Sequence, residues 1–155
     1  MTFYRPTTWE DVYFVVDNMR EEDQDECRAN GYTPLDALSL SYENSIVSYT
    51  LHTPDGVPAA IMGVSKSGIG PQFGVIWMLG TNDIQHHKVY ALRRCKPFLS
   101  DLYEEMGMEC FYNYTYSENK LHHSWLKWLG FTFLRSVALP PDGHDFYEFV
   151  RLKEL

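Results

Sequence analysis

Apolar residues recur along the chain with two different periods, and the first forty residues follow the helical one. There, apolar positions lie three to four residues apart, which is the spacing of one helix face. A strand is predicted over 2–5, and helices are predicted after Thr8, over 21–29 and over 34–40. Asp11 follows Thr8 by three residues, a pair typical of a capped helix start.

The middle of the chain changes to the pattern of strands. Three runs rich in β-branched and aromatic residues cover 45–52, 57–64 and 73–79. Residues 54–56 (Pro-Asp-Gly) have hairpin turn chemistry, and a glycine-containing loop over 65–72 joins the second run to the third. Three consecutive antiparallel strands are therefore predicted.

The rest of the chain alternates between helix and strand. A long helix is predicted from about Gln85 to Met106, because apolar residues keep the helical spacing as far as Gly107. Pro97 should kink this helix. The remaining predicted elements are a strand over 109–116, a helix over 119–129, a strand over 131–138, a turn over 140–143 and a strand over 144–152.

This order predicts an α/β (α+β) fold with a mixed, mostly antiparallel sheet of about six to seven strands, flanked by about four to five helices. Strands 4 and 5, over 73–79 and 109–116, lie on either side of the long helix. They should be parallel, because a helical crossover joins them.

Composition narrows the class of protein. The chain has 155 residues, of which 45% are hydrophobic, and this suits a single domain over 1–155. A formal net charge of −8 argues against nucleic acid and anionic membranes as partners, because both attract Lys and Arg.

The cysteines indicate reduced thiols rather than a disulfide framework. Cys27, Cys95 and Cys110 are odd in number and widely spaced, and no Cys/His spacing resembles a metal site.

The N-terminus lacks the continuous apolar run of a signal peptide, and no run approaches the ~18 residues that a membrane span needs. A cytoplasmic protein without a bound metal is expected.

One segment carries a resemblance to a known superfamily. "SENKLHHSWLKWLGFTF" places Asn119 after the predicted fifth strand, then a helix, then Gly130-Phe131 at the start of the sixth strand. With the element order, this resembles the GCN5-related N-acetyltransferase (GNAT) superfamily, in which strands 4 and 5 splay apart. "RPTTWEDV", His122 and Leu126 further resemble the GNAT-like internal virion (core) proteins of short-tailed phages. That resemblance implies the host cytoplasm or a virion interior as the location.

The resemblance to GNAT enzymes implies a reaction and a cofactor site. In such enzymes an amine of a small molecule or protein attacks the thioester of acetyl-CoA, so a base, an oxyanion donor and a thiol acid are needed. The implied cofactor-binding residues are Met78 and Leu79 on strand 4, Gly80 and Thr81 before the next helix, and Asn119.

Two departures weaken that implication. Asp83 places a negative charge where the cofactor phosphates are expected, and Leu126 stands where the family usually has the Tyr that protonates the thiolate. Tyr116 and His122 are the candidates for a substitute acid, although His122 also suits packing or the surface. Asn119 suits a helix N-cap as well as a cofactor contact.

Two classes of function stay open at this point. The first is an acetyl-CoA-dependent N-acyltransferase with a relaxed phosphate loop. The second is a non-catalytic GNAT-like protein that uses the fold to bind virion proteins or a host protein. His86 and His87, which open the long helix, could face a phosphate or lie on a solvated surface.

Overall fold

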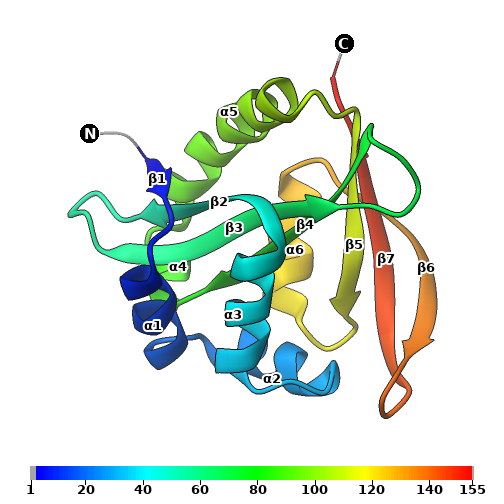
Figure 1. Cartoon of the computed structure of the whole chain (residues 1–155). Helices are drawn as coiled ribbons and strands as arrows, with labels where there is room; N and C mark the ends of the chain where they lie inside the picture. Colours follow the sequence, from blue (N-terminus) through cyan, green and yellow to red (C-terminus); the bar gives the residue numbers. More distant parts are fainter. Residues whose placement is uncertain (1–2, 155) are drawn as a thin grey trace.

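The computed structural model describes residues 3–154, which form one seven-stranded mixed sheet with helices on both faces (Figure 1). The strand order across the sheet is β1-β2-β3-β4-β5-β7-β6. In chain order the elements are β1 (Tyr4–Pro6), α1 (Trp9–Asp17), α2 (Glu21–Ala29), α3 (Pro34–Asn44), β2 (Ser45–His52), β3 (Pro58–Lys66), β4 (Phe73–Gly80), α4 (Asn82–His86), α5 (Lys88–Met106), β5 (Cys110–Tyr116), α6 (Lys120–Trp128), β6 (Thr132–Leu139) and β7 (His144–Leu152).

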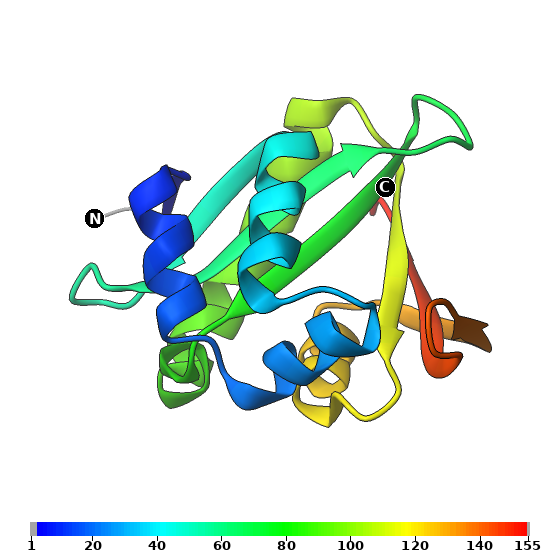
Figure 2. The ribbon, with the colours of Figure 1, turned by 60° about the horizontal axis from the view of Figure 1, so that its bottom comes forward.

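The sheet splays between β4 and β5. These two strands are parallel and pair over three positions, from Phe73 opposite Cys110 to Val75 opposite Tyr112. Every other pair of neighbouring strands is antiparallel. Figure 2 shows β4 and β5 close at one end and far apart at the other. The predicted mixed sheet and the predicted splay are both confirmed.

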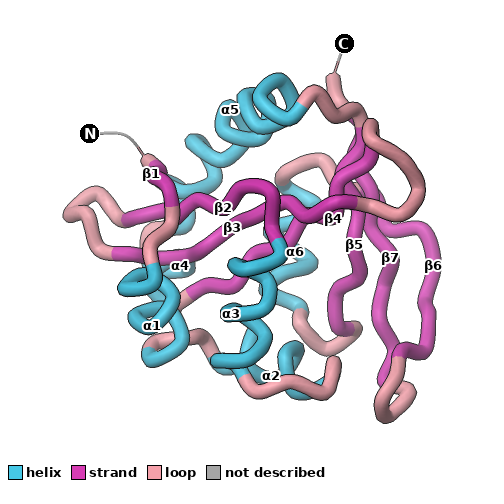
Figure 3. Tube along the Cα trace, in the orientation of Figure 1, coloured by secondary structure: helices cyan, strands magenta, loops and turns pink. Residues whose placement is uncertain are grey.

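Helices α1, α2 and α3 cover one face of the sheet, called the front face below, and α4, α5 and α6 cover the back face (Figures 2 and 3). Each face has its own apolar core. The front core is built around Val12, Leu38 and Ile61, and the back core around Leu99 and Phe111. Strands β3 and β4 contribute side chains to both cores, because successive side chains along a strand point to opposite faces of the sheet.

Local signals in the sequence explain most of the helix ends. The Thr8 side chain accepts a hydrogen bond from the Asp11 backbone, and the Asp11 carboxylate accepts one from the Thr8 backbone, so the predicted capping pair is present. Helix α3 continues to Asn44, past the predicted end near Leu40. Its last turn is held by Tyr42, whose ring lies 4.8 Å from that of Trp9.

The segment predicted as one helix from Gln85 is two helices, so residues 3–154 contain six helices. Helix α4 starts earlier because the Thr81 hydroxyl accepts a hydrogen bond from the Asp83 backbone N–H. His87 then leaves helical geometry, with φ −109° and ψ 37°, and separates α4 from α5. Helix α5 runs through Pro97 and ends at Gly107, whose φ of 63° suits glycine.

The first strand begins at Tyr4 and ends at Pro6, whereas 2–5 was predicted. Thr2 lies outside the described residues. Cys27, Cys95 and Cys110 are all buried free thiols, as predicted.

Candidate functional site

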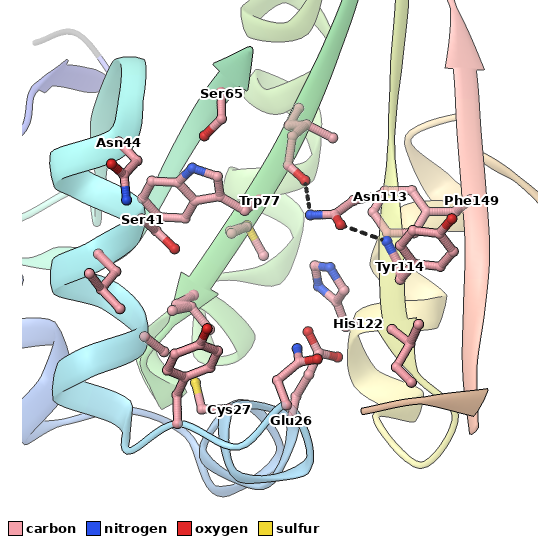
Figure 4. Close-up of a pocket in the computed structure, with 18 residues that line it drawn as sticks. Glu26, Cys27, Ser41, Asn44, Ser65, Trp77, Asn113, Tyr114, His122 and Phe149 are labelled. Carbon is pink, nitrogen blue, oxygen red and sulfur yellow. Dashed lines mark hydrogen bonds between the residues drawn. The ribbon is translucent and has the colours of Figure 1, made fainter. Parts of the chain in front are cut away.

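The divergence of β4 from β5 leaves a cavity of about 510 Å³ on the front face, called the front cavity below. Figure 4 shows it between α3 and β4 on one side and β5 on the other, with α2 across its lower end. A cavity of this size suits a small-molecule ligand or a single side chain of another protein.

Glu26 of α2 is the acidic group of the front cavity. Its Oε1 accepts hydrogen bonds from Thr115 Oγ1 (2.9 Å), the Tyr116 backbone N–H (2.8 Å) and Asn119 Nδ2 (3.2 Å). Burial, together with the nearby charge of Asp23, raises the pKa of the Glu26 carboxyl to about 7. This carboxyl therefore gains or loses a proton near neutral pH, and a cation beside it would favour the charged form.

Asp23, one turn before Glu26, ties the far ends of the two splayed strands together. Its Oδ2 accepts hydrogen bonds from Arg20 Nε (2.8 Å) and from the Gly80 backbone N–H at the end of β4 (2.8 Å). Its Oδ1 accepts one from Asn119 Nδ2 (2.9 Å), next to α6. Arg20, Asp23 and Asn119 are each 1% exposed. We call these three residues with Gly80 the strand-end bridge.

His122 of α6 points into the gap between β4 and β5 (Figure 4). It is 6% exposed, and its Nδ1 has no hydrogen-bond partner in the described part of the chain. Burial lowers the pKa of this imidazole to about 4, so the ring is neutral at pH 7. His122 therefore closes the inner wall of the front cavity.

On the back face, the continuation of the same gap is nearly filled. The space there measures about 20 Å³, little more than one water molecule needs. It is lined by His122, Trp125 and Leu126 of α6, by Leu129 directly after that helix, and by Met78 of β4. We call this space the back gap.

The edge of β4 that faces β5 is also largely occupied. The Ile76 carbonyl accepts a hydrogen bond from Asn113 Nδ2 (2.8 Å). The Gly80 N–H donates to Asp23, and the Gly80 carbonyl accepts from the Arg20 backbone. Peptide groups two residues apart in a strand point to the same edge, so those of Met78 lie on the edge of Ile76 and Gly80, beyond the last residue paired with β5. They are the groups of this edge that an extended ligand could still bond.

The start of α4 offers little to a phosphate. The Asp83 backbone N–H donates to Thr81 Oγ1, and the Thr81 N–H donates to the Ala59 carbonyl. The Asp83 carboxylate also lies 3.5 Å from exposed His86. Taken with the narrow back gap, these contacts leave few groups for coenzyme A, and of the groups named above the Met78 peptide groups remain available.

The structure brings together most of the residues predicted from the sequence. Met78, Leu79 and His122 line the front cavity, and Asn119 caps α6 while it donates to Asp23 and Glu26. The ring of Tyr116 instead lies against His144 and Phe146, with centroid distances of 5.7 and 5.6 Å. Its contribution to the site is the backbone N–H that binds Glu26. The catalytic roles of Tyr116 and His122 stay predictions.

The strand-end bridge and Glu26 could not be singled out in the sequence. Helix α2 reads Glu-Glu-Asp-Gln-Asp-Glu-Cys, which is typical of a solvated acidic helix. One feature of the sequence could have indicated them: Asp23, Glu26 and Cys27 are three to four residues apart, which puts the two acids on the same helix face as a buried thiol.

Three solved structures that share this architecture are acetyltransferases. A GNAT-family acetyltransferase from Bacillus anthracis matches with a TM-score of 0.69 and 13% identity, over 98% of this chain and 95% of that chain. Spermidine N-acetyltransferase from Vibrio cholerae, in complex with CoA and spermine, matches with a TM-score of 0.71 and 12% identity, over 97% and 94%. AAC(6')-Ib in complex with ribostamycin and coenzyme A matches with a TM-score of 0.71 and 16% identity, over 97% and 92%.

The chain therefore has the GNAT fold. No family model matches the sequence, and no curated protein matches it either. Within residues 3–154, no helix combines the length and apolar character needed to cross a membrane, and no three His, Cys, Asp or Glu side chains are grouped so that they could hold a metal ion.

Proposed function

We propose that this protein is a single GNAT-like domain that binds an amine in the front cavity, and that this binding, rather than acetyl transfer, is its function. The amine belongs to a small molecule or to a side chain of a host or virion protein. One observation carries the proposal: the front cavity is open and contains Glu26, whereas the back gap measures about 20 Å³.

The charge of the front cavity supports an amine ligand. Among the described residues that line it, Glu26 is the one carboxylate, and none is Lys or Arg. His122 is neutral at pH 7, so no cation in the lining repels an ammonium group. An ammonium group would form a charge-assisted hydrogen bond with Glu26, whose Oε2 has no hydrogen bond within residues 3–154.

The resemblance to the internal virion proteins of short-tailed phages supports the non-catalytic assignment. A protein packaged in a virion, or acting in the host cytoplasm, can use the fold to hold a partner without turnover. Fold alone does not decide between binding and catalysis, because function depends on the site.

The second candidate is the acetyl-CoA-dependent N-acyltransferase. The splay of β4 from β5 and the available Met78 peptide groups favour it. For a pantetheine chain to reach Met78, the side chains of His122 and Leu126 would have to leave the back gap, since both enclose it.

Calorimetric titration of the purified protein separates the two candidates. Titrations with CoA and acetyl-CoA up to millimolar concentration should give no heat, and a panel of primary amines should include binders. Micromolar binding of acetyl-CoA, with amine-dependent release of free thiol, would establish the acyltransferase instead. In that case Tyr116→Phe and His122→Ala, measured separately, would identify the substitute acid.

A further inference from the structure

Trp77 lines the front cavity, and its indole contacts Ser45 and Gly63. It lies on the front face, and its Nε1 donates a hydrogen bond to Ser45 Oγ (2.7 Å). Figure 4 shows the indole between β4 and α3, at the end of the cavity away from Glu26. The Trp77 ring is therefore a fixed aromatic surface at the opposite end from the carboxylate.

Gly63 makes the position of this indole possible. Gly63 is directly opposite Trp77 in the β3–β4 register. A Cβ at residue 63 would lie 2.4 Å from Cζ2 and 2.6 Å from Cε2 of the indole. Any larger residue there would push the ring away from the sheet, toward α3 and into the cavity.

The two ends of the cavity differ in chemistry. One end carries a single carboxylate, Glu26, and the other carries the indole together with the neutral polar side chains of Ser41, Asn44 and Ser65. A ligand with several separated charges would find only one opposite charge. A ligand with one charge and an apolar or aromatic body would use both ends.

We propose that the front cavity selects monocationic amines with an apolar or aromatic body, with the ammonium group at Glu26 and the body against Trp77, and that Gly63 and Ser45 set this selectivity by positioning the indole. This proposal rests on the proposed amine binding and specifies the class of amine. Binding requires no covalent step.

The experiment is calorimetric titration at pH 8, where the Glu26 carboxyl is mostly ionised, with three probes. Tyramine is an aromatic monocation, 4-ethylphenol is its neutral analogue, and spermidine is a polycation without a ring. Tyramine should bind at least about 10-fold more tightly than 4-ethylphenol, because a hydrogen bond to a charged group contributes that much or more. It should also bind more tightly than spermidine, which has no ring to place against Trp77.

Variants assign the two ends of the cavity. Glu26→Gln should reduce tyramine affinity to the level of 4-ethylphenol and leave 4-ethylphenol unchanged. Gly63→Ala should weaken both ring-bearing probes by about 10-fold, since the displaced indole fills part of the cavity. Gly68→Ala is the matched control, because a Cβ at Gly68 meets nothing within 4 Å, and it should bind as the parent does.

The outcomes distinguish the two proposals. If no amine binds at all, amine binding itself fails. If spermidine binds more tightly than tyramine, or if Gly63→Ala binds tyramine as the parent does, amine binding survives and the selectivity proposal is overturned. Should Gly63→Ala fail to fold, Ser45→Ala removes the other contact of Trp77 and must then weaken tyramine binding for the proposal to stand.

Discussion

The front and back of the β4–β5 splay differ in how their space is used. The front cavity of about 510 Å³ contains the Glu26 carboxyl, whose pKa burial raises to about 7, and the Trp77 indole. The back gap of about 20 Å³ is packed by α6 residues such as Trp125 and Leu126. The same strand divergence therefore leaves an open cavity on one face and an apolar core on the other.

The difference shows that splayed strands alone do not decide how the space between them is used. The GNAT resemblance implies that backbone groups near Met78 and Leu79 on β4 would hold a thioester cofactor. Here the Ile76 carbonyl bonds to Asn113, and Gly80 bonds to Arg20 and Asp23. Ile76 and Gly80 therefore bond within the chain on this edge, and the Met78 peptide groups between them remain available.

The largest expected effect comes from breaking the strand-end bridge. Asp23→Ala should lower the free energy of unfolding by about 3–5 kcal/mol, because it leaves Arg20 buried and without its charged partner. Urea denaturation monitored by far-UV circular dichroism measures the change. Asp25→Ala is the control, since the Asp25–Arg28 pair is exposed, and it should change stability by less than about 1 kcal/mol. Equal losses in both variants would contradict the role of the bridge.

A second change tests the back gap. Leu126→Tyr restores the residue that the GNAT resemblance implies, but Leu126 is 4% exposed in a packed core. The larger side chain should cost about 1–3 kcal/mol of stability, and it should confer no acetyl transfer because the gap has no room for a cofactor. Measurable acetyl-CoA turnover in this variant would mean that the back gap opens readily.

The pH dependence of stability compares the front carboxyl with the buried imidazole. The pKa of Glu26 is raised from 4.5 to about 7, so its contribution to folding is greatest at low pH and is lost as the pH rises through that window. The pKa of His122 is lowered from 6.5 to about 4, so its contribution is present above pH 6.5 and is lost as the pH falls toward 4. The two contributions oppose each other.

Glu26→Gln should therefore make unfolding free energy rise more steeply between about pH 4 and pH 7 than it does in the parent protein. Urea midpoints at several pH values test this. Parallel curves for the parent and Glu26→Gln would show that Glu26 keeps an ordinary pKa.

The smallest expected effect concerns the thiols. Cys27 lines the front cavity, whereas Cys95 is fully buried in the back core. Burial raises the pKa of both thiols to about 12, so both react slowly in the native protein. Mass spectrometry after brief maleimide treatment should find Cys27 modified before Cys95. Modification of Cys95 first would show that the back of the molecule opens more readily than the front.

The sequence predicted the parts of the fold that depend on neighbours along the chain. The Thr8–Asp11 capping pair, the Gly107 helix end and the β2–β3 hairpin were all recognisable, because each is decided within a few residues. Helix α4 was missed because its start depends on one side chain, the Thr81 hydroxyl, in a segment that also reads as the beginning of a longer helix.

The candidate site was predicted only in part. Asn119 was found because it follows a strand and starts a helix, where its side chain accepts a hydrogen bond from the His122 backbone N–H. The roles of Asp23, Glu26 and Trp77 depend on partners more than ten residues away: Gly80, Thr115 and Ser45. Pairings between distant residues leave no periodic pattern in the sequence, so local rules could not identify them.

Because β4 and β5 share three residue pairs, the sheet consists of two blocks, β1–β4 and β5–β7, joined at a weak seam. Amide hydrogen exchange should then resolve two protected units, with the Met78 amide at the seam exchanging earlier than amides within either block. A ligand in the front cavity would touch both sides of this seam, because residues of β4 and of β5 line the cavity. Its binding would slow the opening of one block from the other, so occupancy of the cavity could be followed by exchange rates without a label.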